Sequence, residues 1–303
     1  MEVIQFSTKQ AYDSSPLILA IGEFDGVHLG HKAIIQAAKG YKKDTDYLAV
    51  LCFSDSRKGL QERITPEKEK IALLNLFGVQ RYYTDVSIDH SDITIREFIL
   101  KYISKLNVKR FIVDEDFQFR NKKESVFELV KVCAEINIPI TVVPTVKING
   151  KRINSESIYS LIEAGKMEAV QSQLSRPYSI TGKVVHGEAL GRTLGFPTIN
   201  LGEMESYVFP KSGVYLGTAE IQNESDANEI WNVLISAGYR PTVDGKGYLI
   251  EAYLIDYSGD LYGKTVSVSF LRYMREEIKF NGLDPLIKQM ELDKMEARSI
   301  MGL

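Results

Sequence analysis

The stretch Ile21-Gly22-Glu23-Phe24-Asp25-Gly26-Val27-His28-Leu29-Gly30-His31, the histidine turn (residues 21–31), decides the fold of the first half of the chain. An apolar run of strand length at residues 16–21 leads into it, and helix-forming residues follow at 32–38. A strand, a glycine turn and a helix in this order make a phosphate site, because backbone N–H groups and the positive end of the helix dipole point at the turn. His28 and His31 add two donors that can be cationic, and Gly30 keeps the gap between them open.

Two histidines near a turn more often belong to a solvated loop, but the longer pattern around them counts against this alternative. The segment resembles the H-x-G-H nucleotidyltransferase superfamily. Its longer form, G-x-F-D-G-V-H-x-G-H, is similar to the adenylyltransferase half of bacterial bifunctional riboflavin kinase/FAD synthetases. The resemblance implies that His28 and His31 are catalytic. It also implies ATP or phosphate contacts at Gly22, Phe24, Asp25, Gly26, Gly30 and, from a later motif, Ser155.

Length and composition indicate a globular protein of two domains. A chain of 303 residues with 44% hydrophobic content supplies a core for each domain. No apolar stretch approaches the roughly 18 residues of a membrane helix and no signal-peptide pattern opens the chain, so we expect a cytoplasmic protein without a membrane partner. A net charge of −3 argues against broad nucleic-acid binding. Cys52 and Cys133 lie in apolar surroundings, which predicts buried free thiols.

Strand-like and helix-like segments alternate after the histidine turn, which predicts a parallel sheet covered on both faces. Strands are expected at 47–53, 80–84, 110–113 and 140–143, and helices at 66–77, 95–106 and 126–136. We interpret residues 1–177 as a Rossmann-like α/β domain of the FMN adenylyltransferase kind. In such sheets the ligand lies at the carboxyl ends of the strands, where the histidine turn falls.

Later motifs of the family are altered in this half. Residues 52–57 read Cys-Phe-Ser-Asp-Ser-Arg where the family has a T-F-D-P-H-P-like segment. In the G-x-D-F-x-F-G loop, Asp114 and Arg120 replace the two glycines, so side chains stand where backbone approach was possible. The resemblance implies that the retained residues of this loop, Asp116, Phe117 and Phe119, bind flavin.

The I-S-S-T-x-I-R motif, which binds nucleotide phosphates in the family, is altered at residues 153–159. Ser155 is retained, whereas Glu156 replaces the threonine and Tyr159 replaces the arginine. An arginine offers a phosphate a fixed positive fork, and a tyrosine offers one neutral hydroxyl. Because nucleotidyl transfer depends mainly on charge stabilisation, these changes predict a weakened adenylyltransferase.

From residue 178 the pattern changes to closely spaced β runs, after a linking helix expected at 154–174. Runs at 179–185, 213–221, 231–235, 249–257 and 265–270, without intervening helices, predict an antiparallel sheet or small β-barrel. An amphipathic helix is expected at 282–299. We interpret residues 178–303 as a second domain, a small antiparallel barrel with a C-terminal helix.

A glycine-rich segment at residues 182–201 carries the chemistry of this half. Four glycines within residues 182–195 can simply form turns between strands. The segment nevertheless resembles the riboflavin kinase signature G-R-x-L-G-F-P-T-x-N throughout. The resemblance implies ATP contacts from Gly182, His186, Gly191, Arg192, Gly195 and Phe196. It also implies that Thr198 and Asn200 hold Mg²⁺, and two neutral oxygens suit a hard cation whose other ligands are phosphate and water.

Glu251 is a lone carboxylate within an otherwise apolar strand. Such a residue often just faces solvent. It matches, however, the glutamate of the family's V-E-V-H-L-L-D-F strand, and the resemblance implies that it accepts the proton of riboflavin's ribityl 5′-hydroxyl. The same resemblance implies flavin contacts from Arg275 and Glu277.

The chain is therefore interpreted as a riboflavin kinase with FMN adenylyltransferase activity, a transferase of phosphorus-containing groups. Its substrates would be the small molecules ATP, riboflavin and FMN, with Mg²⁺ as cofactor. Two alternatives stay open at this point. One is a monofunctional flavokinase with a degenerate first domain, and the other is a flavin-sensing regulatory protein, which would need the kinase residues to be idle.

Overall fold

The computed structural model describes residues 1–5, 13–53, 62–84, 93–119, 124–187, 194–222, 228–242 and 245–302. The chain divides into two compact units, Met1–Ser155 and Glu156–Leu303. The helical segment before Pro177 therefore groups with the second unit, and the division of function at 177/178 stays a prediction.

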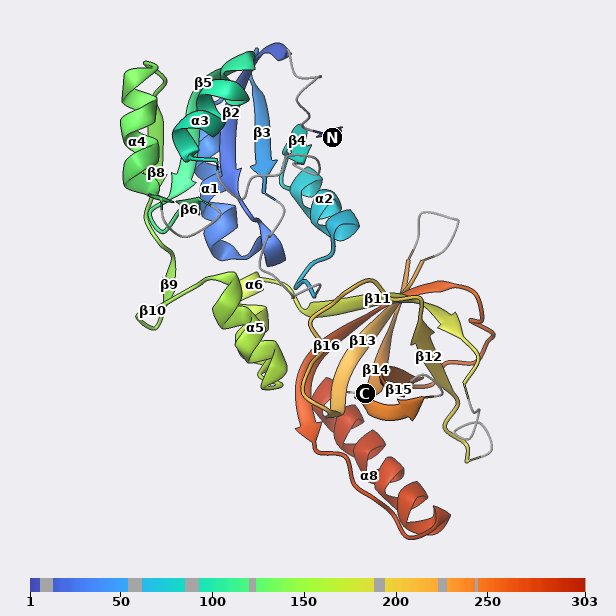
Figure 1. The fold of residues 1–303 in the computed structure, drawn as a ribbon. Coiled ribbons are helices and arrows are strands. Elements are labelled where there is room, and N and C mark those ends of the chain that lie inside the picture. The colour runs from blue at the N-terminus through green and yellow to red at the C-terminus, as the bar shows by residue number, and fades with distance from the viewer. Residues whose placement is uncertain are drawn as a thin grey trace. The chain divides into compact units, whose positions relative to one another are not determined.

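A parallel sheet forms the centre of the first unit, as the alternating pattern predicts (Figure 1). In the described part its strand order is β1-β4-β3-β2-β5-β8, and every pair is parallel. The strands are β1 (Glu2–Gln5), β2 (Asp13–Gly22), β3 (Tyr47–Cys52), β4 (Arg81–Thr84), β5 (Leu106–Asp114) and β8 (Ile140–Val143). Short two-residue strands add β6 (Gln118–Phe119), β7 (Glu124–Ser125), β9 (Lys147–Ile148) and β10 (Lys151–Arg152).

Both faces of this sheet are covered by helices. These are α1 (Leu29–Tyr41), α2 (Glu67–Leu76), α3 (Ile95–Lys101) and α4 (Val126–Glu135), with short 3₁₀ turns η1 (Asp25–Val27) and η2 (Ile103–Lys105). Strand β2 shows why: Leu17 and Leu19 pack with α3 and α4, whereas the alternate Ile18 and Ala20 pack with α1 and α2. A strand that is apolar on both sides needs a layer on each, which is the α/β arrangement.

Two helices rather than one follow the sheet. The structure has α5 (Ser155–Glu163) and α6 (Met167–Leu174), so the single helix expected at 154–174 is wrong. The break falls at Gly165, whose φ of +70° ends α5 in the left-handed region. Helix α6 contacts the barrel strands, and Arg272 pairs with its Glu168 at 3.0 Å.

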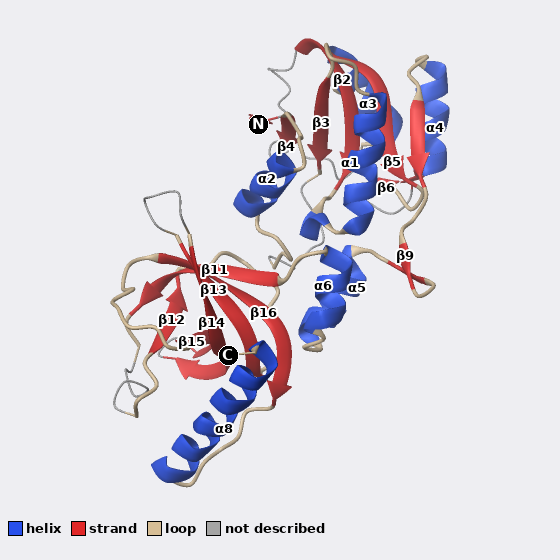
Figure 2. Cartoon of the chain, turned by 180° about the vertical axis from the view of Figure 1, so that it is seen from behind, coloured by secondary structure: helices blue, strands red, loops and turns tan. Residues whose placement is uncertain are grey.

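The second unit is a closed antiparallel barrel with strand order β11-β12-β15-β14-β13-β16, followed by the long helix α8 (Figure 2). Its elements are β11 (Tyr178–Val185), β12 (Thr198–Gly202), β13 (Gly213–Ile221), β14 (Glu229–Thr242), β15 (Gly245–Leu254), β16 (Thr265–Arg275) and α8 (Leu283–Met301). The predicted barrel and C-terminal helix are confirmed. Strand β12 is not among the expected β runs, because its residues carry the pattern of a binding motif rather than that of a strand.

Helix α8 covers part of the barrel's outer face. Phe196, Tyr253 and Leu234 form an apolar cluster with Ala297 of the helix. Because side chains alternate along each strand, residues two positions from Tyr253 share this outer face. Glu251 is one of them, which sets the location of the second site.

Candidate active sites

The backbone of the histidine turn is unusual. Phe24 and Val27 have φ of +54° and +41°, and Gly26 lies between them at +78°. Positive φ is energetically unfavourable for residues that carry a side chain, most of all for a β-branched residue such as valine. Both side chains are fully buried, so packing holds this strained turn at the carboxyl end of β2.

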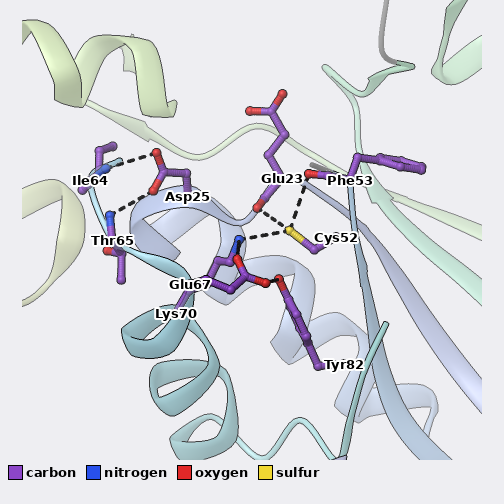
Figure 3. A network of polar contacts seen from close by, with 9 residues as sticks. All are labelled: Glu23, Asp25, Cys52, Phe53, Ile64, Thr65, Glu67, Lys70 and Tyr82. Carbon is purple, nitrogen blue, oxygen red and sulfur yellow. Dashed lines mark hydrogen bonds and ion pairs between the residues drawn. The ribbon is translucent and has the colours of Figure 1, made fainter. Parts of the chain in front are cut away.

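Asp25 ties the turn to distant segments (Figure 3). Its carboxylate, 3% exposed, accepts hydrogen bonds from the backbone N–H groups of Ile64 (3.2 Å) and Thr65 (3.0 Å). Its carbonyl accepts one from the Ser155 hydroxyl at 3.1 Å. The structure thus gives Asp25 and Ser155 a role in fixing the turn, and direct ATP contacts from them stay a prediction.

His28 caps the N-terminus of α1. Its Nδ1 accepts hydrogen bonds from the backbone N–H groups of Gly30 (3.1 Å) and His31 (3.4 Å). An accepting Nδ1 carries no proton, so we assign the ring proton to Nε2. The His28 ring therefore occupies two of the N–H groups that were expected to face a ligand. A Cβ at Gly30 would lie 2.9 Å from the His28 ring, which explains the glycine between the histidines.

The His31 ring is buried beside that of His28. Their ring centroids are 3.7 Å apart, and the Phe24 ring lies 4.9 Å from His31. Burial lowers the pKa of His31 well below its ordinary value, and the positive charges of His28, when its ring is protonated, and of Lys70 lower it further. His31 is therefore a neutral donor at neutral pH, not a cation. Its buried Nδ1 has no hydrogen-bond partner among the described residues.

A polar network, the Lys70 network (Cys52, Glu67, Lys70 and Tyr82), lies beside the turn, and of its members only Glu67 is exposed (Figure 3). The Cys52 thiol donates to the Glu23 carbonyl at 2.8 Å, and the Lys70 ammonium lies 3.3 Å from Cys52 Sγ. Lys70 also pairs with Glu67 at 2.7 Å, and the Tyr82 hydroxyl donates to Glu67 at 2.5 Å. The network joins α2, β3 and β4 to the start of the histidine turn.

Protonation states in this network follow from burial and pairing. Burial raises the pKa of Cys52, so it stays a thiol, as expected for a buried free cysteine. Burial by itself lowers the pKa of Lys70, but its contacts with Cys52 and Glu67 raise it, and the net shift is upward. Lys70 therefore stays an ammonium cation beside the turn at neutral pH.

The predicted flavin residues of the first unit are engaged within the protein. Asp116 pairs with Arg152 at 2.6 Å and accepts a hydrogen bond from Thr145. Phe117 and Phe119 are 6% and 2% exposed and belong to the core between the sheet and α3 and α4. Flavin contacts from these residues stay a prediction.

Asp114 stands where the family has a glycine. Burial raises its pKa to about 6, and the neighbouring Asp116 contributes to the rise. Its Oδ1 is buried and has no hydrogen-bond partner in the part of the chain that the structure describes. The carboxyl group at this position therefore holds its proton to a higher pH than an exposed aspartate does.

Other predicted positions lie outside the described residues. These are Gly191 and Arg192 of the kinase signature and the altered positions 54–57 and 120. Glu156 is exposed and Tyr159 half-buried in the second unit. Their part in adenylylation stays a prediction from the sequence.

The second site is built on neighbouring strands of the barrel. The antiparallel register places Asn200 of β12 directly opposite Glu251 of β15, with Ser236 of β14 on its other side. Thr198 is two residues from Asn200 and shares its face. All of these groups stand on the outer face, and Glu251, Asn200 and Thr198 are half-buried. The structure therefore brings together the predicted base and the predicted metal ligands.

Among the described residues, no side chain or backbone group binds the Glu251 carboxylate. It makes no hydrogen bond or ion pair with any of the residues that the structure describes. A carboxylate with available lone pairs beside two neutral oxygens can accept a proton and face a cation-bound phosphate.

The segment that precedes β12 is held by a close glycine contact at Gly187 and by ring stacking at His186. A Cβ at Gly187 would overlap the Asn200 side chain, so this glycine lets the Asn200 amide lie against the backbone. The His186 ring stacks on Tyr262 with centroids 3.9 Å apart. Gly182 lies in β11 close to the Gly202 carbonyl, and ATP contacts from these residues stay predictions.

Phe196 and Gly195 precede β12. Phe196 is 3% exposed and packs edge-on against Tyr253 at 5.3 Å, so it belongs to the core beneath α8. Gly195 is exposed with φ of +86°. ATP contacts from these two residues also stay predictions.

Arg275 and Glu277 lie at the end of β16. Arg275 forms a bidentate pair with Asp293 of α8, with Nη2 2.6 Å and Nε 2.9 Å from the carboxylate oxygens. Gln289 donates to the same carboxylate at 2.9 Å. The Glu277 carboxylate lies over Gly238, where a Cβ would meet its Oε1 at 2.7 Å. Arg275 therefore anchors α8. Flavin contacts from Arg275 and Glu277 stay a prediction.

Several of these groups carry no clear signal in the sequence. The run Glu67-Lys68-Glu69-Lys70 is typical of a solvated helix face, and nothing local marks Lys70 as buried. Asp293 is 4% exposed and is the buried charged residue of helix α8, whose other charged residues are exposed or half-buried. Only the spacing of Glu67 and Lys70, three residues apart, hints at a pair.

Known families match both halves of the chain. The model described as FAD synthetase matches residues 10–157, and the one described as riboflavin kinase matches residues 174–301. The bifunctional riboflavin kinase/FMN adenylyltransferase of Bacillus subtilis (strain 168) is 32% identical, covering 92% of this chain and 91% of the relative. That of Escherichia coli (strain K12) is 33% identical, covering 94% and 93%.

One solved structure is similar over nearly the whole chain. It is the crystal structure of a macrolide-efflux protein from Streptococcus pneumoniae, with a TM-score of 0.88 and 29% identity over 98% of this chain and 99% of that one. The word efflux in that name describes the Streptococcus pneumoniae protein and not this chain. In the described ranges of this chain, no helix combines the length and the apolar character that crossing a membrane requires.

Proposed function

This chain belongs to the family of bifunctional riboflavin kinase/FMN adenylyltransferases, and from that premise we propose where its two reactions take place. As in that family, one reaction converts riboflavin and ATP to FMN and ADP, and the other converts FMN and ATP to FAD and pyrophosphate. We place the kinase reaction around Glu251 on the barrel and the adenylyl transfer at the histidine turn.

The register of β12 and β15 carries the kinase proposal. Glu251 accepts the proton of the ribityl 5′-hydroxyl while that oxygen attacks the γ-phosphorus of ATP. The bond from the γ-phosphorus to the bridging oxygen breaks, and ADP leaves. Support comes from the position of Asn200 directly opposite Glu251 and from the lack of a protein partner for this carboxylate among the described residues.

Thr198 and Asn200 fit Mg²⁺, because a hydroxyl and an amide oxygen on one strand face are hard, neutral ligands. These two residues would hold the ion. When bound, the ion neutralises phosphate charge. Glu251 then serves as the proton acceptor rather than as a metal ligand, since the oxygens of Thr198 and Asn200 are the ligands that the protein provides.

At the histidine turn, a phosphate oxygen of FMN attacks the α-phosphorus of ATP, and the bond to the leaving pyrophosphate breaks. Charge that builds on the phosphate oxygens is stabilised by preorganised N–H donors. His28 presents Nε2–H because its Nδ1 is committed to the helix N-terminus. His31 adds a neutral ring whose low pKa keeps a cation from forming there.

The altered motifs support a slow second reaction. Tyr159 and Glu156 stand where the family carries an arginine and a threonine, and the transition state loses one cation. A monofunctional flavokinase is not favoured, because the FAD synthetase model matches and the relatives are bifunctional.

The experiment is a time course with the full chain. Purified protein is incubated with ATP and Mg²⁺ and either riboflavin or FMN, and FMN and FAD are separated by chromatography. We expect FMN to form from riboflavin faster than FAD forms from supplied FMN. Absence of FAD from supplied FMN overturns the placement of an active adenylyl site at the turn, and absence of FMN overturns the kinase proposal.

A further inference from the structure

Neither reaction as described so far uses the Lys70 network. Lys70 is 8% exposed, and its ammonium contacts the Cys52 thiol and the Glu67 carboxylate. Burying an ammonium is costly, and its ion pair with Glu67, whose side chain is 50% exposed, returns little net stability. A buried ammonium in this place therefore points to a role in the site beside it.

The Cys52 sulfur links the network to the turn. The Cys52 thiol donates to the carbonyl of Glu23 at 2.8 Å, directly before Phe24, where the backbone enters the left-handed region. Lys70 donates to the same sulfur at 3.3 Å and so orients the thiol proton toward that carbonyl. Tyr82 and Lys70 both bind the Glu67 carboxylate, which fixes the ammonium in turn.

The same ammonium acts on the histidines by its charge. Among the causes that lower the pKa of His31, burial is the largest, the charge that His28 carries when its ring is protonated is next, and the charge of Lys70 from α2 follows. A fixed positive charge near a histidine disfavours its imidazolium form. Lys70 thus connects the position of the turn to the protonation of its histidine.

We propose that Lys70 is a positioning residue for adenylyl transfer, acting on the histidine turn through the Cys52 thiol and on His31 through its charge. The proposal rests on the placement of adenylyl transfer at this turn. Lys70 does not contact the reacting atoms. Its removal loosens the entry to the strained turn and lets His31 take up a proton at higher pH.

The test uses the full-length protein with supplied FMN, ATP and Mg²⁺, and the riboflavin kinase rate of each variant as an internal control. Lys70→Met removes the charge and keeps the chain length. Lys68→Met is the matched control, because Lys68 is exposed on the same helix. Cys52→Ala cuts the link to Glu23 and retains the charge, and Cys52→Ser restores a hydroxyl that can both donate and accept.

We expect Lys70→Met to lower kcat for FAD formation by about 10- to 100-fold, as for a small misplacement of reacting groups. The kinase rate and the Lys68→Met variant stay within about twofold of the parent. The acid limb of the pH–rate profile moves to higher pH in Lys70→Met, because His31 loses a positive neighbour. In Cys52→Ala the rate falls without a shift of that limb, and Cys52→Ser recovers most of it.

A Lys70→Met variant that makes FAD at the parent rate with an unmoved acid limb overturns the proposal. If Lys70→Met does not fold, equal rates for Cys52→Ala and Cys52→Ser overturn it instead. His31→Asn separates this inference from the site assignment. If His31→Asn loses FAD formation and Lys70→Met keeps it, the site assignment stands and only the role of Lys70 is rejected. If His31→Asn keeps full activity, the site assignment itself is rejected.

Discussion

The two sites are held in place by different means. At the barrel, Asn200 and Glu251 face each other because the backbone ladder of β12 and β15 sets their register. At the histidine turn, the backbone is strained, and side-chain hydrogen bonds from Asp25, Ser155 and Cys52 hold it. One site is fixed by main chain, and the other by side chains from distant segments.

The difference bears on how each half tolerates substitution. A strand register is shared by many backbone hydrogen bonds, so one side chain seldom moves it. The turn depends on partners 40 residues away at Thr65 and 130 residues away at Ser155. The motif changes all precede the barrel in the sequence, whereas the barrel keeps its key residues.

The largest effect is expected for Glu251→Gln. The amide keeps the shape but cannot take the hydroxyl proton, so FMN formation falls by about 100-fold or more. Adenylylation of supplied FMN stays unchanged. Glu220→Gln is a matched control, since Glu220 is also a half-buried strand glutamate of the barrel. A Glu251→Gln variant that phosphorylates riboflavin near the parent rate means that Glu251 is not the base.

Asn200→Ala should raise the Mg²⁺ concentration that half-saturates the kinase by about tenfold or more, since it removes one metal oxygen. Titration of the FMN-forming rate with Mg²⁺ measures this. Asn232→Ala, a half-buried asparagine of β14, serves as the control. Joint loss of FMN and FAD formation in Asn200→Ala contradicts two separate sites.

The double variant Glu156→Thr with Tyr159→Arg should raise FAD formation from FMN severalfold. It restores a cation and removes a negative charge from a phosphate-binding motif, and both changes favour the transition state. FMN formation from riboflavin stays the same, which is the internal control. If FAD forms no faster, or if the parent already matches its kinase rate, another residue such as Arg57 or Arg120 supplies the positive charge.

The smallest effect concerns Asp114. Its pKa in the folded protein is raised to about 6 by burial, above the ordinary 3.8. As pH rises from about 4 to about 6, the unfolded chain loses this proton first, so folding loses stability and the full cost remains above pH 6. Asp114→Asn cannot ionise and should raise the melting temperature of the first unit by a few degrees at pH 8.

Calorimetry of Asp114→Asn at pH 8 and pH 4 checks this, with the exposed Asp44→Asn as control. The gain should shrink at pH 4, where the parent carboxyl group is largely protonated in the folded state and partly so in the unfolded chain. An equal gain at both pH values shows that ionisation of Asp114 is not the cause.

Much of the fold follows from local pattern. Alternating apolar segments predict the parallel sheet and its two helical layers, and the closely spaced β runs predict the barrel. The helix expected across residues 154–174 fails at Gly165, because a glycine inside an apolar helical pattern does not show whether the backbone takes positive φ there. Strand β12 escapes prediction because a five-residue strand after a proline carries little pattern of its own.

By itself, the sequence determined the position of the histidine turn, the kinase signature and Glu251, because these are contiguous motifs whose chemistry follows from residue types. Only the tertiary structure decided which partner each of these polar groups binds. It gave the Nδ1 of His28 to the helix N-terminus, the carboxylate of Asp25 to a loop 40 residues away, and the ammonium of Lys70 to a buried thiol. The reason is physical: hydrogen bonds and burial form between segments that are remote in sequence, and no local pattern records which of them meet.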